Sequence, residues 1–192
     1  MGKTQRDIIT LAHDHLRQRS QKVGIITSDI KQLVKDMEDA TLDWEDSRKH
    51  EVGVALAAIQ IDLPLRVVVV RNNFDDKSDR TFQAFINPKI TKFEGKVEED
   101  FEGCLSVKDI YGKVPRYQKV RISALDLNGK QIRVVAEGFL ARVFQHEIDH
   151  TNGIVFIDHI KDKPEAFFRL TEEGHLDALD YEKDVKNNSI LW

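Results

Sequence analysis

Residues 143–153 read VFQHEIDHTNG and contain two histidines four positions apart, His146 and His150, with Glu147 directly after the first. Residues four apart share one face of an α-helix, so a helix would present both imidazoles on the same side. Two apolar side chains fall on the same stripe, Phe139 and Val143. The stripe therefore predicts an inward-facing helix. Buried imidazoles and a carboxylate are costly unless something satisfies them, and a metal ion does so.

A metal site that performs chemistry usually has three protein ligands and one open position. The third ligand must come from another segment. Downstream, Glu172 and Glu173 are acidic candidates. Upstream, the sequence EGCLS (102–106) contains the single cysteine of the chain, Cys104. A thiolate is a good ligand for zinc or ferrous iron. The residues alone leave both choices open.

The composition excludes several classes of protein. The 192 residues are enough for one domain with a hydrophobic core, and we expect a single domain over residues 1–192. A net charge of −4 provides no basic field for nucleic acid. No stretch approaches the ~20 apolar residues of a membrane span. Without a secretion signal, we expect a cytoplasmic protein whose lone cysteine is not in a disulfide.

The hydrophobic pattern predicts helices near both ends and strands between them. Helical spacing covers residues 1–45 and 163–184, in addition to 139–150. Strands are expected over 66–71, over 82–95 with a break at Pro88, over 117–138 as a hairpin turning at Asn128-Gly129, and over 155–160. The predicted fold class is α+β, with mixed or antiparallel sheets around a central metal-bearing helix, a helical N-terminal segment and a C-terminal helix. The last residues, EKDVKNNSILW, are predicted to form a tail.

Three segments in order resemble the peptide deformylase family: GVALAAIQ (53–60), EGCLS (102–106) and QHEIDH (145–150). The segments INPKI, VPRY, DLNGK and NGIVFIDHI are also similar, so the resemblance covers about residues 50–160. It implies that Cys104, His146 and His150 hold one divalent metal ion. The ion expected from the family is Fe²⁺, with Zn²⁺, Ni²⁺ or Co²⁺ found in some preparations.

The family removes the formyl group from the N-terminal formyl-methionine of newly made polypeptides and releases formate. The resemblance implies that Glu147 is the general base, and that the Gln60 side-chain amide and the Leu105 N–H stabilise the oxyanion. It implies a methionine pocket and a peptide-binding strand formed by Gly53, Val54, Ala55, Arg142 and Val143. It assigns supporting roles to Glu102, Arg116 and Asp149, with Asp149 paired to Arg116.

The partners implied are N-formyl-methionyl peptides, near the ribosomal exit, with no membrane and no sequence-specific nucleic acid. A monomer is expected. The sequence departs from the family at three positions, since Ala55 replaces a glycine, Lys108 a proline and Thr151 a leucine. These departures leave open a divergent metal-binding relative with reduced activity or another formylated substrate. Two further alternatives are a zinc endopeptidase with an acidic third ligand and a nonenzymatic interaction domain.

Overall fold

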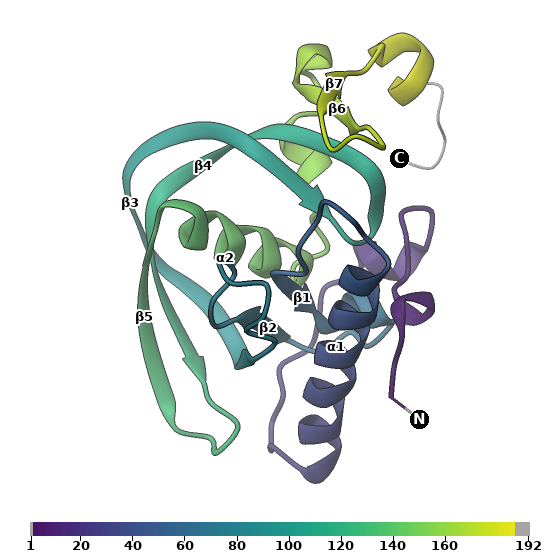
Figure 1. Ribbon diagram of the computed structural model, residues 1–192. Helices are drawn as coiled ribbons and strands as arrows, with labels where there is room; N and C mark the ends of the chain where they lie inside the picture. The colour runs from purple at the N-terminus through teal and green to yellow at the C-terminus, as the bar shows by residue number, and fades with distance from the viewer. Residues whose placement is uncertain (1, 187–192) are drawn as a thin grey trace.

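A curled antiparallel sheet wraps around one α-helix (Figure 1). The computed structural model describes residues 2–186. Within that range the sheet has seven strands in the order β1-β2-β3-β4-β6-β7, and β5 pairs with β4 beside this path. The strands are β1 (Ala55–Ala57), β2 (Val67–Arg71), β3 (Phe82–Cys104), β4 (Val107–Leu125), β5 (Gln131–Glu137), β6 (Phe167–Leu170) and β7 (Leu176–Ala178). The predicted α+β class is confirmed.

The helix inside the curve is α2 (Gly138–His150), which confirms the predicted central helix over the two histidines. Its apolar side chains pack against the concave face of the sheet, and Phe144 meets Phe85 edge to face at 4.9 Å. After the helix, Gly153 takes a φ of +77°, and a Cβ there would lie 2.3 Å from the Arg17 carbonyl oxygen. The core on one side and this close approach on the other fix the end of the helix that bears the histidines.

The long hairpin of β3 and β4 places the cysteine. The connecting turn is Leu105–Ser106, and Cys104 pairs with Val107 across it. Pro88, where a break was expected, lies within β3 at a register shift between Ile86 and Lys89. The strand therefore continues through a bulge, one of the sheet positions that proline tolerates. The predicted strand at 66–71 and the hairpin of β4 and β5 are also present.

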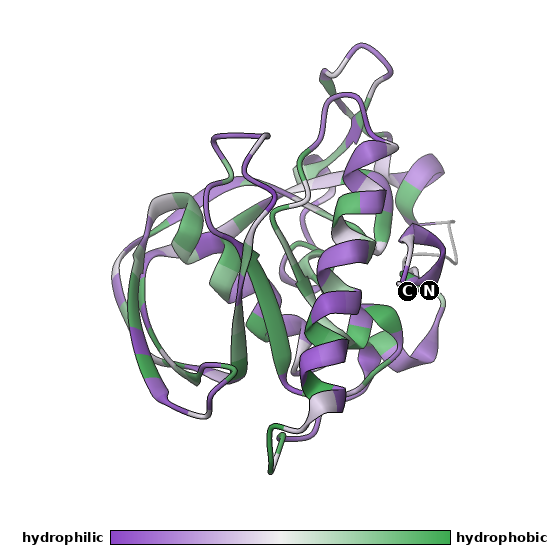
Figure 2. Ribbon diagram, turned by 60° about the horizontal axis from the view of Figure 1, so that its bottom comes forward, coloured by the Kyte–Doolittle hydropathy of each residue, from purple (hydrophilic) through white to green (hydrophobic). Residues whose placement is uncertain are grey.

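The N-terminal prediction is half right. Helix α1 (Ser28–Asp46) packs its buried stripe against β1 and β2, and Figure 2 shows hydrophilic residues along its outer side. The preceding segment is an extended arm with two 3₁₀ turns, η1 (Gln5–Asp7) and η2 (Asp14–Arg17). The arm donates hydrogen bonds to other segments, from Ile9 N–H to the Gln60 carbonyl and from Leu11 N–H to the Ser106 carbonyl. These tertiary bonds replace the helical ones.

The C-terminal helix predicted over 163–184 is wrong. This segment forms a 3₁₀ turn, η5 (Pro164–Ala166), then β6 and β7, then a π turn, η6 (Tyr181–Lys186). Strand β6 pairs with Ile110–Gly112 of β4, so an available sheet edge outweighs the local helical spacing. Residues 155–160, expected to be extended, form the 3₁₀ turn η4 (Phe156–His159), whose Asp158 side chain accepts from Val155 N–H.

Two further predictions concern membrane crossing and the C-terminal tail. Among residues 2–186, no helix combines the length and hydrophobicity that a membrane crossing needs. Most of the predicted C-terminal tail, residues 187–192, lies outside the described residues. The remaining short turn is η3 (Ala58–Ile61), which follows β1 and carries Gln60.

Candidate metal centre and active site

Three potential metal ligands converge from two elements. Cys104 Sγ, at the end of β3, lies 3.2 Å from His150 Nε2, which lies 3.2 Å from His146 Nε2 on the same helix. All three side chains are buried. In a tetrahedral zinc site, bonds of about 2.0–2.1 Å to nitrogen and about 2.3 Å to sulfur separate the ligand atoms by roughly 3.3–3.6 Å. The two separations are close to this range, and all three atoms lie within 4.8 Å of one another, so they can hold one ion with Cys104 as the third ligand.

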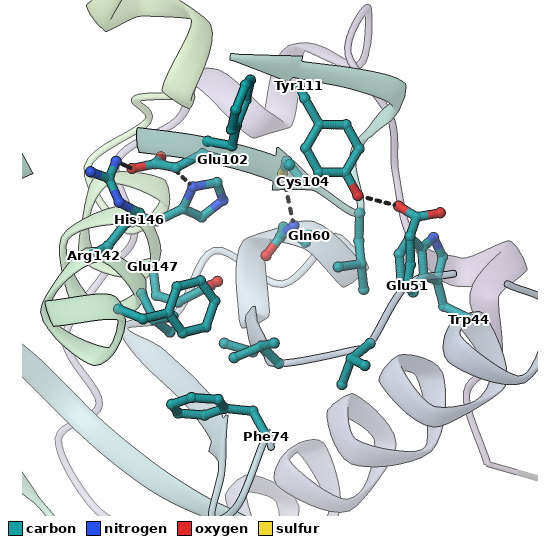
Figure 3. Close-up of a pocket in the computed structure, with 18 of the residues that line it drawn as sticks. Trp44, Glu51, Gln60, Phe74, Glu102, Cys104, Tyr111, Arg142, His146 and Glu147 are labelled. Atoms are coloured by element: carbon teal, nitrogen blue, oxygen red, sulfur yellow. Dashed lines mark hydrogen bonds and ion pairs between the residues drawn. The ribbon is translucent and has the colours of Figure 1, made fainter. Parts of the chain in front are cut away.

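His150 is held in the neutral form that a metal ligand requires. Burial, followed by the positive charge on His146, holds the pKa of His150 well below its usual value, so this imidazole is neutral. His146 Nδ1 lies 3.0 Å from Glu102 Oε2. That contact, marked in Figure 3, engages Nδ1 and leaves Nε2 to contact His150 Nε2 at 3.2 Å. A carboxylate behind a ligand imidazole fixes the ring and its tautomer.

Glu102 is the centre of a buried charge network. Arg116 donates to both of its oxygens, at 2.8 and 3.1 Å, and Arg142 donates to Oε1 at 2.9 Å. Burial alone would raise the pKa of Glu102, but the hydrogen bonds from His146 and Arg116 outweigh it and hold the pKa below its usual value. Arg116 also lies 2.6 Å from Asp149 Oδ2, the contact expected from the sequence, and Asp149 contacts His159 at 2.7 Å.

Glu147 directly follows His146, one of the potential metal ligands, and lines the same cavity. Its carboxyl group is buried, and Oε2 has no hydrogen-bond partner within residues 2–186. Burial raises the pKa of Glu147 to about 7. A carboxyl group with a pKa near neutrality both accepts and releases a proton readily, which is the property of a general acid–base group.

The side-chain amide nitrogen of Gln60 lies beside the sulfur of Cys104. The Gln60 Oε1 atom accepts from Ala57 N–H at 2.9 Å, while Nε2 donates to Ser106 Oγ at 3.1 Å and to Cys104 Sγ at 3.5 Å (Figure 3). The bond from Ala57 fixes which end of the amide is which. Gln60 therefore offers hydrogen-bond donors beside the cysteine, and Leu105 follows the cysteine directly in the turn.

A cavity of about 470 Å³ opens onto these groups. Four of the five residues expected to bind substrate line it, namely Val54, Ala55, Arg142 and Val143. The guanidinium of Arg142 is engaged by Glu102 and by backbone carbonyls, so its part is to brace β3 and β4 against α2. The expected inward position of Phe139 is wrong. Phe139 is 48% exposed, because it lies in the first turn of α2, where it packs edge to face on Phe74.

Gly53 does not line the cavity, but it directly precedes Val54, which does. Its N–H donates to Glu45 Oε2 at 2.9 Å, and a Cβ on Gly53 would lie 2.6 Å from the Thr41 methyl group. Glu45 is paired with Arg71, and both side chains are almost completely buried. The guanidinium of Arg71 also donates to the carbonyls of Lys77 and Asp79. One buried ion pair thus holds both the segment before β1 and the loop after β2.

Sequence reasoning missed the aromatic lining of the cavity. Aromatic side chains from separate segments contribute, namely Trp44, Phe74, Phe101, Tyr111 and Phe139. The Tyr111 hydroxyl donates to Glu51 Oε1 at 2.6 Å (Figure 3). The Tyr111 ring covers Gly103, where a Cβ would lie 2.6 Å from the ring. The nearest signal in the sequence is Gly103 itself, beside Cys104. Phe74 lies in a polar loop that gave no indication of a role.

Comparison with known proteins decides what this arrangement is. A sequence model of the polypeptide deformylase family matches residues 5–166. The chain belongs to that family. A peptide deformylase of Aquifex aeolicus is 38% identical over 156 residues, which are 81% of this chain and 88% of the relative. One of Thermomicrobium roseum is 38% identical over 171 residues, 88% of this chain and 93% of the relative.

Solved structures of this family show the same fold. The peptide deformylase of Synechococcus elongatus, in complex with actinonin, superposes with a TM-score of 0.73 at 33% identity, covering 81% of this chain and 80% of that one. The enzyme of Legionella pneumophila gives 0.71 at 34% identity, covering 83% and 86%. The resemblance expected from the sequence is confirmed. The chain is a metal-dependent hydrolase of the family that removes the N-formyl group from new polypeptides.

Proposed function

We propose that Glu147, Gln60 and Leu105 carry out deformylation beside an ion held by Cys104, His146 and His150. The observation that carries this proposal is the meeting of a sulfur, two imidazole nitrogens, a carboxyl group with a raised pKa and an amide donor at one end of a single cavity. A bound divalent ion supplies Lewis acidity, which lowers the pKa of water and polarises the formyl carbonyl.

Glu147 acts first as the general base and then as the general acid. Its carboxylate removes a proton from the attacking water as the new C–O bond forms at the formyl carbon. The C–N bond then breaks, and Glu147 returns the proton to the leaving nitrogen. The products are formate and a free α-amine. The raised pKa of Glu147 supports this role, because a base that must also act as an acid works best near the pH of its surroundings.

Gln60 and Leu105 stabilise the developing negative charge on the formyl oxygen. The Gln60 amide is fixed by the hydrogen bond that its Oε1 accepts from Ala57 N–H and by the one that its Nε2 donates to Ser106 Oγ, so the donor is in place before the substrate arrives. The Leu105 N–H follows the cysteine in a tight turn. Preorganised donors of this kind are worth about 10²–10³ in rate each.

The substrate is an N-formyl-methionyl peptide, and its backbone adds to β1. Among the described strands β1 ends the sheet, and Val54 and Ala55 line the cavity beside it. An extended peptide can pair with such an edge through main-chain hydrogen bonds. The apolar side chains around the ion, Val54, Leu105 and Val143 among them, suit a methionine side chain.

We assign Fe²⁺ as the native ion. The thiolate and two imidazoles bind ferrous iron well, and Zn²⁺, Ni²⁺ and Co²⁺ accept the same ligands. Protein made anaerobically with Fe²⁺ should carry one iron per chain and release formate from a formyl-Met peptide. Glu147→Ala should keep the metal and lose formate release. Metal-replete wild type that releases no formate would contradict the assignment of the substrate.

The divergent alternative rests on Ala55. Its methyl group lies on the strand that lines the cavity, where the family has glycine. If Ala55 narrows the path of the peptide, then Ala55→Gly should lower KM for formyl-Met peptides with the metal content unchanged. Wild type that is inactive on these peptides but active on another formylated amine would favour this second function.

We also propose that residues 1–192 are one domain that acts as a cytoplasmic monomer on chains leaving the ribosome. The N-terminal arm and α1 pack on one sheet, and the C-terminal strands β6 and β7 belong to that sheet, which supports a single domain. Light scattering on purified protein tests the monomer. Cosedimentation with ribosomes, and cell fractionation, test the other two assignments.

A further inference from the structure

A second group of metal-binding side chains lies outside the active-site cavity. His13 precedes the 3₁₀ turn η2 of the N-terminal arm as its N-cap, His15 lies within that turn, and Asp62 follows η3. Each offers one ligand atom, and the three atoms lie within 4.8 Å of one another. The His15 Nδ1 atom already contacts Asp62 Oδ1, and the rings of His13 and His15 meet edge to face at 4.8 Å.

The backbone on both sides keeps these side chains together. Asp62 is fixed in the left-handed region, with a φ of 65°, at the end of the turn that contains Gln60. On the arm, Leu11 and Leu16 are buried and Ala12 takes a φ of 88°, so the chain turns sharply just before His13. The buried side chains of Leu11 and Leu16 therefore anchor the part of the arm that holds both histidines near Asp62.

We propose that His13, His15 and Asp62 bind a divalent transition cation of the Zn²⁺ or Ni²⁺ class. Two imidazoles with one carboxylate match the preference of these ions, whereas Mg²⁺ and Ca²⁺ select oxygen ligands. About half of the His15 and Asp62 side-chain surface is exposed, at 46% and 45%, so an ion has access from solvent. Water can complete its coordination.

The cation would fasten the arm to the turn that carries Gln60. Ile9 N–H donates to the Gln60 carbonyl at 2.8 Å, and Leu11 N–H donates to the Ser106 carbonyl at 3.0 Å. Asp62 is two residues after Gln60, at the end of the same turn. An ion joining Asp62 to the arm therefore closes a second connection beside these hydrogen bonds, and it reduces the opening of the arm.

The first test is a count of bound ions. Enzyme fully loaded with Ni²⁺ at the active site is titrated calorimetrically with more Ni²⁺, so that no exchange between metals takes place. Wild type should bind one additional ion per chain. His13→Ala, His15→Ala and Asp62→Asn should each lose this additional ion while keeping the first. Asparagine tolerates the left-handed backbone at position 62, so Asp62→Asn preserves the turn.

His175→Ala is the matched control, because it removes a histidine outside this cluster and should leave both ions bound. The second readout is hydrogen exchange at the amides of Ile9 and Leu11. Additional Ni²⁺ should slow their exchange in wild type and in His175→Ala, and should have no effect in His15→Ala. Absence of a second ion in wild type, its persistence in the three variants, or unchanged exchange in the arm would each overturn the proposal. These outcomes do not depend on deformylase activity.

Discussion

Glu102 Oε2 lies 3.0 Å from His146 Nδ1, while Arg116 and Arg142 bind the same carboxylate. One buried charge therefore orients His146, a proposed metal ligand, and joins β3, β4 and α2. The two arginines offset the cost of burying the carboxylate, and the carboxylate offsets theirs. The contacts that orient this proposed metal ligand are therefore also contacts that hold α2 against the sheet.

Replacing Glu102 by glutamine should lower both the stability of the fold and the affinity for the metal. A neutral amide at this position would leave two buried guanidiniums without their shared counter-charge, so the free energy of unfolding should fall by about 3–5 kcal/mol. Affinity for the catalytic metal should fall by about 10–100-fold, because His146 loses its carboxylate partner. Competition with a chelator measures the affinity, and urea denaturation the stability. Glu94→Gln, at an exposed pair with Arg121, is the control. Wild-type metal affinity in Glu102→Gln would contradict the role given to Glu102.

Gln60→Glu should abolish most activity with little change in fold. The side chain keeps its shape, but the end that donates to Ser106 and Cys104 becomes an acceptor, and it brings a negative charge to the oxyanion position. We expect kcat to fall by about 10²–10³. Steady-state kinetics on protein of known metal content measures this. The opposite result, a large rise in KM at constant kcat, would mean that Gln60 binds substrate and does not stabilise the oxyanion.

Glu45→Gln should affect peptide binding from a distance. The side chain does not enter the chemistry, but it fixes Gly53 before β1 and pairs with Arg71, which holds the loop that contains Phe74. If the shift of this segment costs one hydrogen bond between β1 and the peptide, the loss of about 1.4 kcal/mol raises KM about ten-fold. The change in kcat should be smaller. Asp46→Asn, the next residue on α1 with an exposed partner, is the matched control. Equal changes in KM in Glu45→Gln and Asp46→Asn would contradict the positioning role given to Glu45.

Gly103→Ala should distort the segment that carries the cysteine. The added Cβ would lie 2.6 Å from the Tyr111 ring, inside the distance that real contacts allow. We expect loss of metal and of activity, and partial recovery of both when Tyr111→Ser is added. Gly24→Ala, where a Cβ meets nothing within 4 Å, should behave as wild type. Elemental analysis of the three variants and wild type decides the matter, and failure of the double variant to recover would exclude the Tyr111 contact as the cause.

The sequence by itself determined the helix of the metal site, because His146, Glu147 and His150 fall on one helical face whatever the helix packs against. It also determined the hairpin of β4 and β5 and the strand β2, whose patterns are local. The order of the three motifs indicated the family, and with it Cys104 as the third ligand. The helix, the hairpin and the strand depend on neighbours in the chain, which a sequence displays directly.

Tertiary structure decided the rest. The arm before α1 has helical spacing but donates the N–H groups of Ile9 and Leu11 to the carbonyls of Gln60 and Ser106. The segment after Pro164 has helical spacing but pairs with the edge of β4. The cavity gathers Trp44 and Phe74 from segments that share no local pattern. In each case the partner is distant in sequence, and the energy of a long-range hydrogen bond or buried contact exceeds the small propensity differences that local patterns express.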